Sequence, residues 1–153
     1  SSASKSIGAT PAVSALLAEE EKQGLRSLST YLGFQPRADH VKDDLLLFLI
    51  AQKRLGKKVA AYGAAAKGNT LLNYAGVKTD LLPYVCDAAP SKQGKFLPGT
   101  HIPVLHPDAI RERRPDLVLI LPWNIQEEVM QQMAHIHEWD GKFVVAVPSL
   151  NVS

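Results

Sequence analysis

The chain has 153 residues, the usual size of one folded domain, and 46% hydrophobic with 21% charged residues is typical of a globular protein rather than a disordered one. The net charge of +2 is too small to indicate a nucleic acid or an anionic membrane as a partner, and the longest apolar run, residues 45–51, is far shorter than the roughly 18 residues of a membrane span. A single cysteine, Cys86, excludes an intrachain disulfide and a multi-cysteine zinc site, so we expect a reducing, cytoplasmic setting.

The N-terminal part divides into a polar lead-in and two helices. Residues 1–9 are small and polar, begin with Ser and lack the apolar stretch of a signal peptide, so we expect a disordered lead-in or the remnant of a tag, followed by a single domain over 10–153. Apolar residues at helical spacing predict helices over about 10–33 and 39–55. The apolar block 45–50 covers more than one helix face, which indicates packing on several sides.

From residue 57 onward, short apolar runs alternate with helical stretches. Continuous apolar strands separated by helices are typical of a parallel sheet that is covered on both faces. The sequence therefore predicts an α/β fold, a Rossmann-like parallel sheet of about four to five strands with helices on both faces, preceded by the two N-terminal helices. We expect strands at 59–62, 82–86, 117–121 and 143–147, and helices at 69–75, 106–114 and 124–136.

The segment 63–70, between the first strand and its helix, is the most informative candidate site. Ligands of open parallel sheets bind beyond the carboxyl ends of the strands, which is where this segment is expected to lie. Its alanines and glycines let a ligand approach the backbone, the helix start favours an anion, and Lys67 adds a full positive charge. The segment matches neither the dinucleotide fingerprint nor the phosphate-loop motif, so a plain strand-to-helix turn capped by Asn69 is an equal alternative.

The next strand end and the loop after it supply further candidates. Asp87 stands where dinucleotide folds place an acid that holds ribose hydroxyls, although a carboxylate that caps the turn before Pro90 is an equal alternative. The long loop 88–103 is interpreted as an ordered binding arm, against the alternative of a solvated charged loop. The candidate substrate-binding residues are Gly63, Lys67, Gly68, Asn69, Thr70, Asp87, Lys92, Gln93, Lys95 and His101. No metal ligands are expected, because His135 and His137 are two positions apart on a helix and do not share a face.

Three runs of sequence, in this order, carry a resemblance to a known family: YGAAAKGNTLLNY (62–74), KQGKFLPGTHIP (92–103) and LPWN (121–124), the last followed by Glu128. Over about residues 38–150 the chain closely resembles the C-terminal domain of SAM-dependent C-methyltransferases. This family includes the nucleotide-sugar C-methyltransferases.

The resemblance implies a domain that holds a nucleotide-sugar against a SAM-binding domain. The SAM-binding domain and an N-terminal zinc module would lie outside this chain, in the same full-length protein. That protein would be a SAM-dependent C-methyltransferase, whereas this domain alone would bind no cofactor and would be inactive. The resemblance assigns no catalytic residue to this chain.

Two other functions stay open at this point. Asp87 and the strand–loop–helix unit also fit a free-standing nucleotide- or NAD-binding module, against which the missing third glycine of the fingerprint counts. The apolar block 45–50 also fits a non-catalytic interaction domain that docks a partner through its N-terminal helices, although packing within the domain explains the block equally well.

Overall fold

A computed structural model describes residues 35–153, with the side chains of 35–37 excepted. The lead-in expected at 1–9 and the helix expected over 10–33 lie outside these described residues. None of the helices in the described part is both long and apolar enough to cross a membrane.

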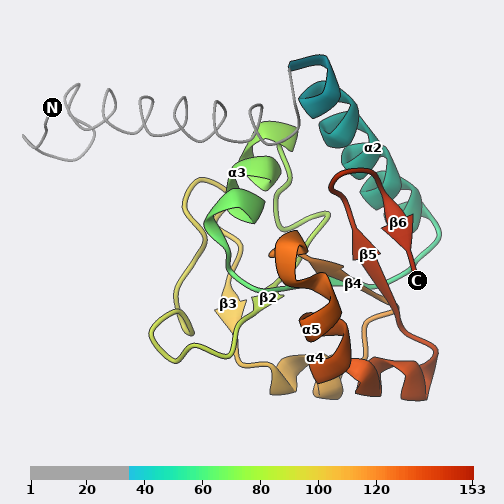
Figure 1. Cartoon of the computed structure of the whole chain (residues 1–153). Coiled ribbons are helices and arrows are strands. Elements are labelled where there is room, and N and C mark those ends of the chain that lie inside the picture. Colours follow the sequence, from blue (N-terminus) through green and yellow to red (C-terminus); the bar gives the residue numbers. More distant parts are fainter. Residues whose placement is uncertain (1–34) are drawn as a thin grey trace, which may run out of the picture.

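A six-stranded sheet forms the centre of the domain, with the strand order β3-β2-β1-β4-β5-β6 (Figure 1). Its strands are β1 (Val59–Tyr62), β2 (Val85–Cys86), β3 (Val104–Leu105), β4 (Leu117–Ile120), β5 (Lys142–Val145) and β6 (Asn151–Val152). Neighbouring strands from β3 to β5 pair in parallel, and only β6 is antiparallel to its neighbour. The predicted α/β fold with a parallel sheet is confirmed, with six strands in place of the four to five expected.

Helices cover both faces of the sheet. α2 packs against α3, and both α4 and α5 lie beside η2; Figure 1 shows the first pair on one side of the sheet and the second group on the other. This arrangement follows from the apolar strands, which need cover on both faces. The helices are α2 (Gln35–Arg54), α3 (Ala66–Ala75), α4 (Asp108–Arg113) and α5 (Gln126–Gln132), with short 3₁₀ helices η1 (Trp123–Ile125) and η2 (Ala134–Trp139).

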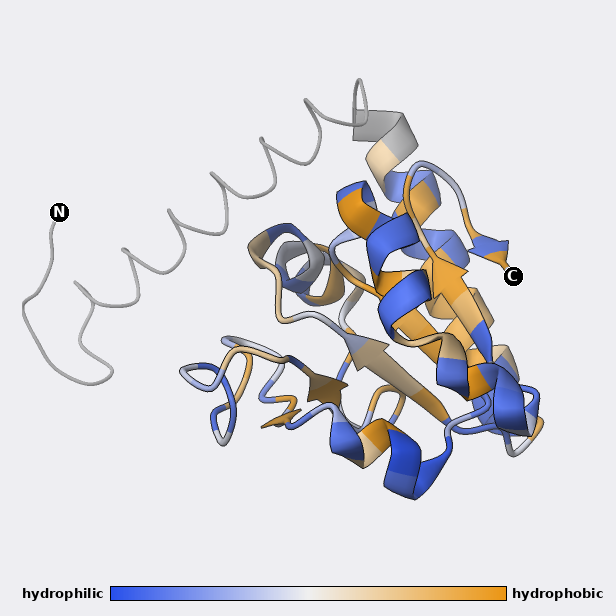
Figure 2. Ribbon diagram, turned by 60° about the horizontal axis from the view of Figure 1, so that its bottom comes forward, coloured by the Kyte–Doolittle hydropathy of each residue, from blue (hydrophilic) through white to orange (hydrophobic). Residues whose placement is uncertain are grey.

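The core lies between these layers, and Figure 2 shows the apolar residues concentrated on the strands and the inner sides of the helices. All residues of β1 and β4 are buried, and the two strands pair over four positions. On α2, Leu45 and Leu49 are fully buried and the partly buried Leu46 and Phe48 also pack against the core, but Leu47 is 66% exposed. Leu47 is the one exposed residue of the block 45–50, so the packing extends beyond one row of side chains, as expected, but does not surround the helix.

Candidate functional site

The connection between β1 and α3 is shorter than the sequence predicted. α3 begins at Ala66 rather than Asn69, so only residues 63–65, here called the β1–α3 turn, lie between strand and helix. Lys67, Gly68, Asn69 and Thr70 consequently belong to the first turns of the helix. An alanine run favours helix, which explains the early start.

The start of α3 carries no side-chain cap. Its N-cap residue is Ala65, which has no side chain able to accept a hydrogen bond, so the alternative in which Asn69 caps the helix is wrong. The first N–H groups of an α-helix have no acceptor within the helix, and the helix dipole places partial positive charge there. Lys67 is exposed at this same helix end. This edge of the sheet is therefore suited to an anion.

The two glycines of this segment serve close packing. A Cβ on Gly63, whose φ is +90°, would lie 2.5 Å from Cδ of Pro122, and a Cβ on Gly68 would lie 2.6 Å from Cβ of Leu121. Gly68 is buried against the end of β4. The glycines let the β1–α3 turn and the first turn of α3 rest directly on residues 121 and 122, and Gly68 does not leave backbone open to a ligand.

Asp87 joins the β1–α3 turn to the loop that follows β2. Its Oδ2 accepts a hydrogen bond from the Ala64 N–H at 2.7 Å, and its Oδ1 accepts one from the Ala89 N–H at 2.8 Å. Its side chain is only 15% exposed. Both carboxylate oxygens thus hold backbone amides, which favours the turn-capping interpretation of Asp87 over the ribose-holding one.

Lys92 and Gln93 return from the loop to the same place. The Lys92 ammonium donates to the carbonyl oxygen of Ala64 at 3.2 Å and lies 3.9 Å from Asp87 Oδ2, with about half of its side chain exposed. The Gln93 side-chain amide donates to the carbonyl oxygen of Asp87 at 2.7 Å. The structure therefore brings Gly63, Lys67, Gly68, Asp87, Lys92 and Gln93 together around the β1–α3 turn.

Lys95 and His101 lie elsewhere on the 88–103 loop. The carbonyl oxygen of Lys95 accepts a hydrogen bond from Val104 N–H at 2.8 Å, at the first residue of β3. His101 has a left-handed backbone (φ 59°) in the turn 97–101, and its N–H donates to the Leu97 carbonyl oxygen at 3.0 Å. Such backbone contacts hold the loop, and they place Lys95 beside β3 and His101 in a separate turn.

That second turn is attached to α3, and to the segment after it, by side chains that were not among the predicted site residues. The Asn73 side-chain amide donates to the Pro98 carbonyl oxygen at 3.0 Å, and the Lys78 ammonium donates to the Gly99 carbonyl oxygen at 3.0 Å. A Cβ on Gly99 would lie 2.1 Å from Oδ1 of Asn73, so the turn lies directly against this side chain. In the sequence, Gly99 was the one sign of this close contact. A single sequence, however, does not reveal which surface a glycine packs against.

Two of the predicted polar side chains are engaged within α3 itself. The Thr70 hydroxyl donates to the Ala66 carbonyl oxygen at 3.0 Å, a bond to the preceding helical turn. The side-chain oxygen of Asn69 accepts from the Asn73 amide at 3.3 Å. These contacts stabilise the helix and its link to the 88–103 loop. The cationic groups of the site are the ammonium groups of Lys67 and Lys92.

Burial shifts the pKa of two side chains at this edge, Cys86 and Tyr62. Burial raises the pKa of the Cys86 thiol to about 12, and burial, followed by the nearby Asp87 charge, raises the pKa of the Tyr62 hydroxyl. Both groups keep their protons at neutral pH. Within residues 35–153, no group of three or more His, Cys, Asp or Glu side chains is placed to hold a metal ion.

Comparison with known proteins identifies the family. Residues 1–148 match the family model described as the C-methyltransferase C-terminal domain. The C-methyltransferase NovU of Streptomyces niveus is 35% identical over 142 residues, which is 93% of this chain and 34% of that protein, so the chain spans about a third of the length of this curated relative. The resemblance carried by the three sequence runs is confirmed. The chain belongs to the C-methyltransferase C-terminal domain family.

Proposed function

We propose that this domain binds a nucleotide-sugar, or a similar phosphorylated substrate, at the start of α3. The observation that carries the proposal is the pair of ammonium groups, Lys67 and Lys92, beside a helix start without a side-chain cap. Amide groups at a helix start and charge-assisted bonds from lysine are common phosphate ligands. Ala64, Ala65 and Ala66 are partly or fully exposed and have short side chains, which permits a bulky diphosphate to approach.

In the full-length enzyme this substrate would be presented to a SAM-binding domain that lies outside this chain. SAM supplies the methyl group that is transferred, and the residues described here would bind and orient the acceptor. The relative that shares this domain is named a C-methyltransferase, and two thirds of its length lie beyond the match. We propose that this remainder corresponds to a zinc module and a SAM-binding domain, and that the enzyme works in the cytoplasm.

A nucleotide cofactor site within this domain is less well supported. An NAD-binding module needs an acid at the end of its second strand with free oxygens for the ribose hydroxyls. Asp87 occupies that position, but each of its carboxylate oxygens accepts a backbone N–H, from Ala64 and Ala89. The same contacts argue that SAM is bound outside this domain.

Titration calorimetry and NMR with a nucleoside diphosphate and its sugar conjugate test the proposal. We expect Lys67→Ala and Lys92→Ala each to weaken binding by about 1–3 kcal/mol, because each removes a charge-assisted hydrogen bond to phosphate. Lys92→Arg keeps the charge and should retain most of the affinity, and Lys142→Ala, an exposed lysine at the start of β5, is the matched control.

Three results would count against this site. If Lys95→Ala weakened binding as much as Lys67→Ala, the ligand would lie along the outer part of the loop. Chemical-shift changes confined to another surface would place the ligand there. A clear rise in melting temperature with NAD, and none with a nucleoside diphosphate, would favour the cofactor module instead.

A further inference from the structure

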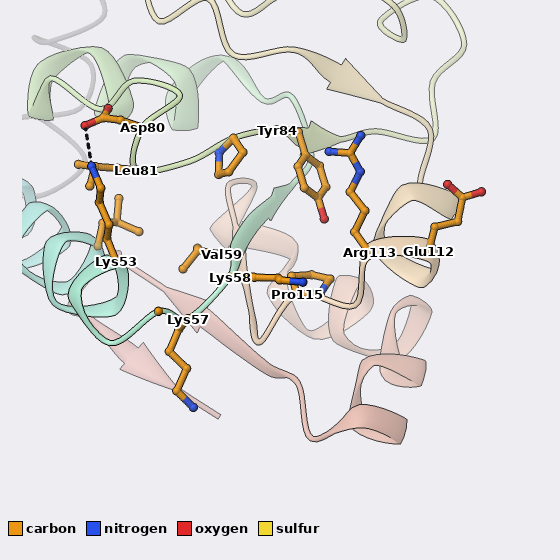
Figure 3. A pocket seen from close by; sticks show the side chains of 13 residues that line it. Lys53, Lys57, Lys58, Val59, Asp80, Leu81, Tyr84, Glu112, Arg113 and Pro115 are labelled. Atoms are coloured by element: carbon orange, nitrogen blue, oxygen red, sulfur yellow. Dashed lines mark ion pairs between the residues drawn. The ribbon is translucent and has the colours of Figure 1, made fainter.

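A cavity of about 540 Å³ opens at the amino ends of the strands, on the edge of the sheet opposite the β1–α3 turn (Figure 3). It is bounded by the end of α2, the start of β1, the segment before β2 and the end of α4. Neither the family resemblance nor the substrate proposal uses this edge. The side chains that line it include Lys53, Lys58, Asp80, Leu81, Tyr84 and Arg113.

Tyr84 contributes a buried hydroxyl to the wall of this cavity. Its side chain is only 5% exposed, and among the described residues its Oη has no hydrogen-bond partner. Figure 3 shows the hydroxyl pointing into the space between Arg113 and Pro115. A buried hydroxyl without a partner is unfavourable, and native proteins satisfy nearly all such groups with protein, water or ligand. Burial also raises the pKa of Tyr84 to about 12, so the hydroxyl keeps its proton and can donate it to an acceptor.

The charges around the cavity favour an anion. Four of its lining side chains are basic and two are acidic. Lys53 is paired with Asp80 at 3.6 Å, while the Arg113 guanidinium lies 4.7 Å above the Tyr84 ring. In Figure 3 Lys58 extends along the cavity toward Pro115. Basic residues at helix ends also offset the helix dipole, but that role leaves the Tyr84 hydroxyl without a partner.

The rest of the lining is apolar. Leu49 and Val59 form the floor with buried side chains, and Leu81, Pro83 and Pro115 complete the wall. A pocket that combines an apolar lining with a few convergent polar groups is the usual form of a small-molecule site. Inorganic phosphate alone would leave this apolar surface uncovered.

We propose that this cavity binds a small organic anion with an apolar body. Its oxyanion head accepts a hydrogen bond from Tyr84 and pairs with Arg113 and Lys58. Its apolar body covers Leu81 and Pro83. The site is separate from the proposed nucleotide-sugar site, so either can fail without the other.

Titration of the 153-residue protein with phenyl phosphate, followed by amide NMR shifts, tests this proposal. We expect saturable shifts at Val59, Tyr84 and Arg113, at about millimolar ligand. Phenol, which lacks the anion, and inorganic phosphate, which lacks the apolar body, should each bind at least about fivefold more weakly. Equal binding by inorganic phosphate would overturn the assignment of an organic ligand, and shifts confined to residues 63–70 would overturn the site.

Two variants and a matched control sharpen the test. Tyr84→Phe removes only the hydroxyl and should weaken binding about fivefold, and Arg113→Gln should weaken it about tenfold. Arg111→Gln on the same helix, outside the cavity lining, should leave binding unchanged. Tyr84→Phe should keep or raise the melting temperature, because no internal hydrogen bond is lost. A marked fall in the melting temperature would show that the hydroxyl is already satisfied inside the protein, and equal affinity in all variants would refute the proposal.

Discussion

At the residue scale, three glycines explain why the family's sequence runs occur together. Gly63 and Gly68 come from the first run and rest on residues 121 and 122 of the third, and Gly99 of the second run rests on Asn73 of the first. In each case an added Cβ would lie closer than 3 Å to the facing residue. The runs are therefore parts of one packed unit around α3.

Gly68→Ala tests this packing. Alanine favours a helix by about 1 kcal/mol over glycine, but its Cβ would meet Leu121, including the backbone Cα at 3.2 Å. We expect the clash to prevail, with a net loss of about 1–2 kcal/mol in the free energy of unfolding, measured by urea denaturation. Gly94→Ala is a useful comparison, because its φ of +77° brings backbone strain alone, with nothing within 4 Å. A more stable Gly68→Ala protein would show that the contact with Leu121 relaxes freely.

The sequence predicted the site residues unevenly, for a physical reason. Lys67, Asp87 and Lys92 follow strand ends, and the parallel sheet brings strand ends to one edge. Asn73 and Lys78 were missed because their partners are carbonyl oxygens of a distant loop, which any residue type supplies. A side chain that bonds to backbone needs no particular residue type as its partner, so the sequence shows no matching residue.

At the element scale, long apolar runs were predictable and short pairings were not. The strands β1, β4 and β5 lie within two residues of their predicted bounds. The apolar run 82–86 predicted a longer β2. Leu82 and Tyr84 are buried, yet only the last two residues of the run pair as a strand. β3 and β6 have two residues each, too few for an alternating or continuous apolar pattern. The helix predicted over 124–136 is divided into η1, α5 and η2, since apolar spacing does not distinguish α from 3₁₀ turns.

Asn73→Ala tests the attachment of the 88–103 loop to α3. The change removes the hydrogen bond to the Pro98 carbonyl oxygen and the surface on which Gly99 rests. We expect faster hydrogen–deuterium exchange in residues 96–102, unchanged exchange in β1, and a loss of about 1 kcal/mol in stability. Thr70→Ala is the matched control, because its hydroxyl bonds only within α3 among the contacts described here. Equal exchange in the two variants would mean that the loop is held by other contacts.

At the scale of the whole molecule, burial makes the fold sensitive to alkaline pH. Burial raises the pKa of both Cys86 and Tyr84 to about 12, from ordinary values of 9.0 and 10.0. The unfolded chain therefore loses these protons at lower pH than the folded one, so the stabilisation is complete below the ordinary pKa and is lost as pH rises toward the folded value.

We expect the free energy of unfolding to fall between pH 9 and about 12, by up to about 1.4 kcal/mol per pH unit for each group. Denaturant titrations at several pH values would measure this slope. Cys86→Ala, which removes one of the two groups from the core, should flatten it. An identical slope in the variant would mean that Cys86 does not contribute to the alkaline loss of stability.

Both margins of the sheet are occupied by short pieces of this same chain. Residues 94–96 run antiparallel along the outer side of β3, through hydrogen bonds between Gly94, Lys95 and Val104, and the two-residue β6 covers β5. Edge strands with long rows of unpaired backbone amides and carbonyls can pair with a strand of another chain, by β-augmentation or in a fibril. Among the described residues, neither edge of the sheet presents a long row of unpaired backbone amides and carbonyls. A neighbouring domain therefore forms more contacts with the helices and loops than it would by adding a strand.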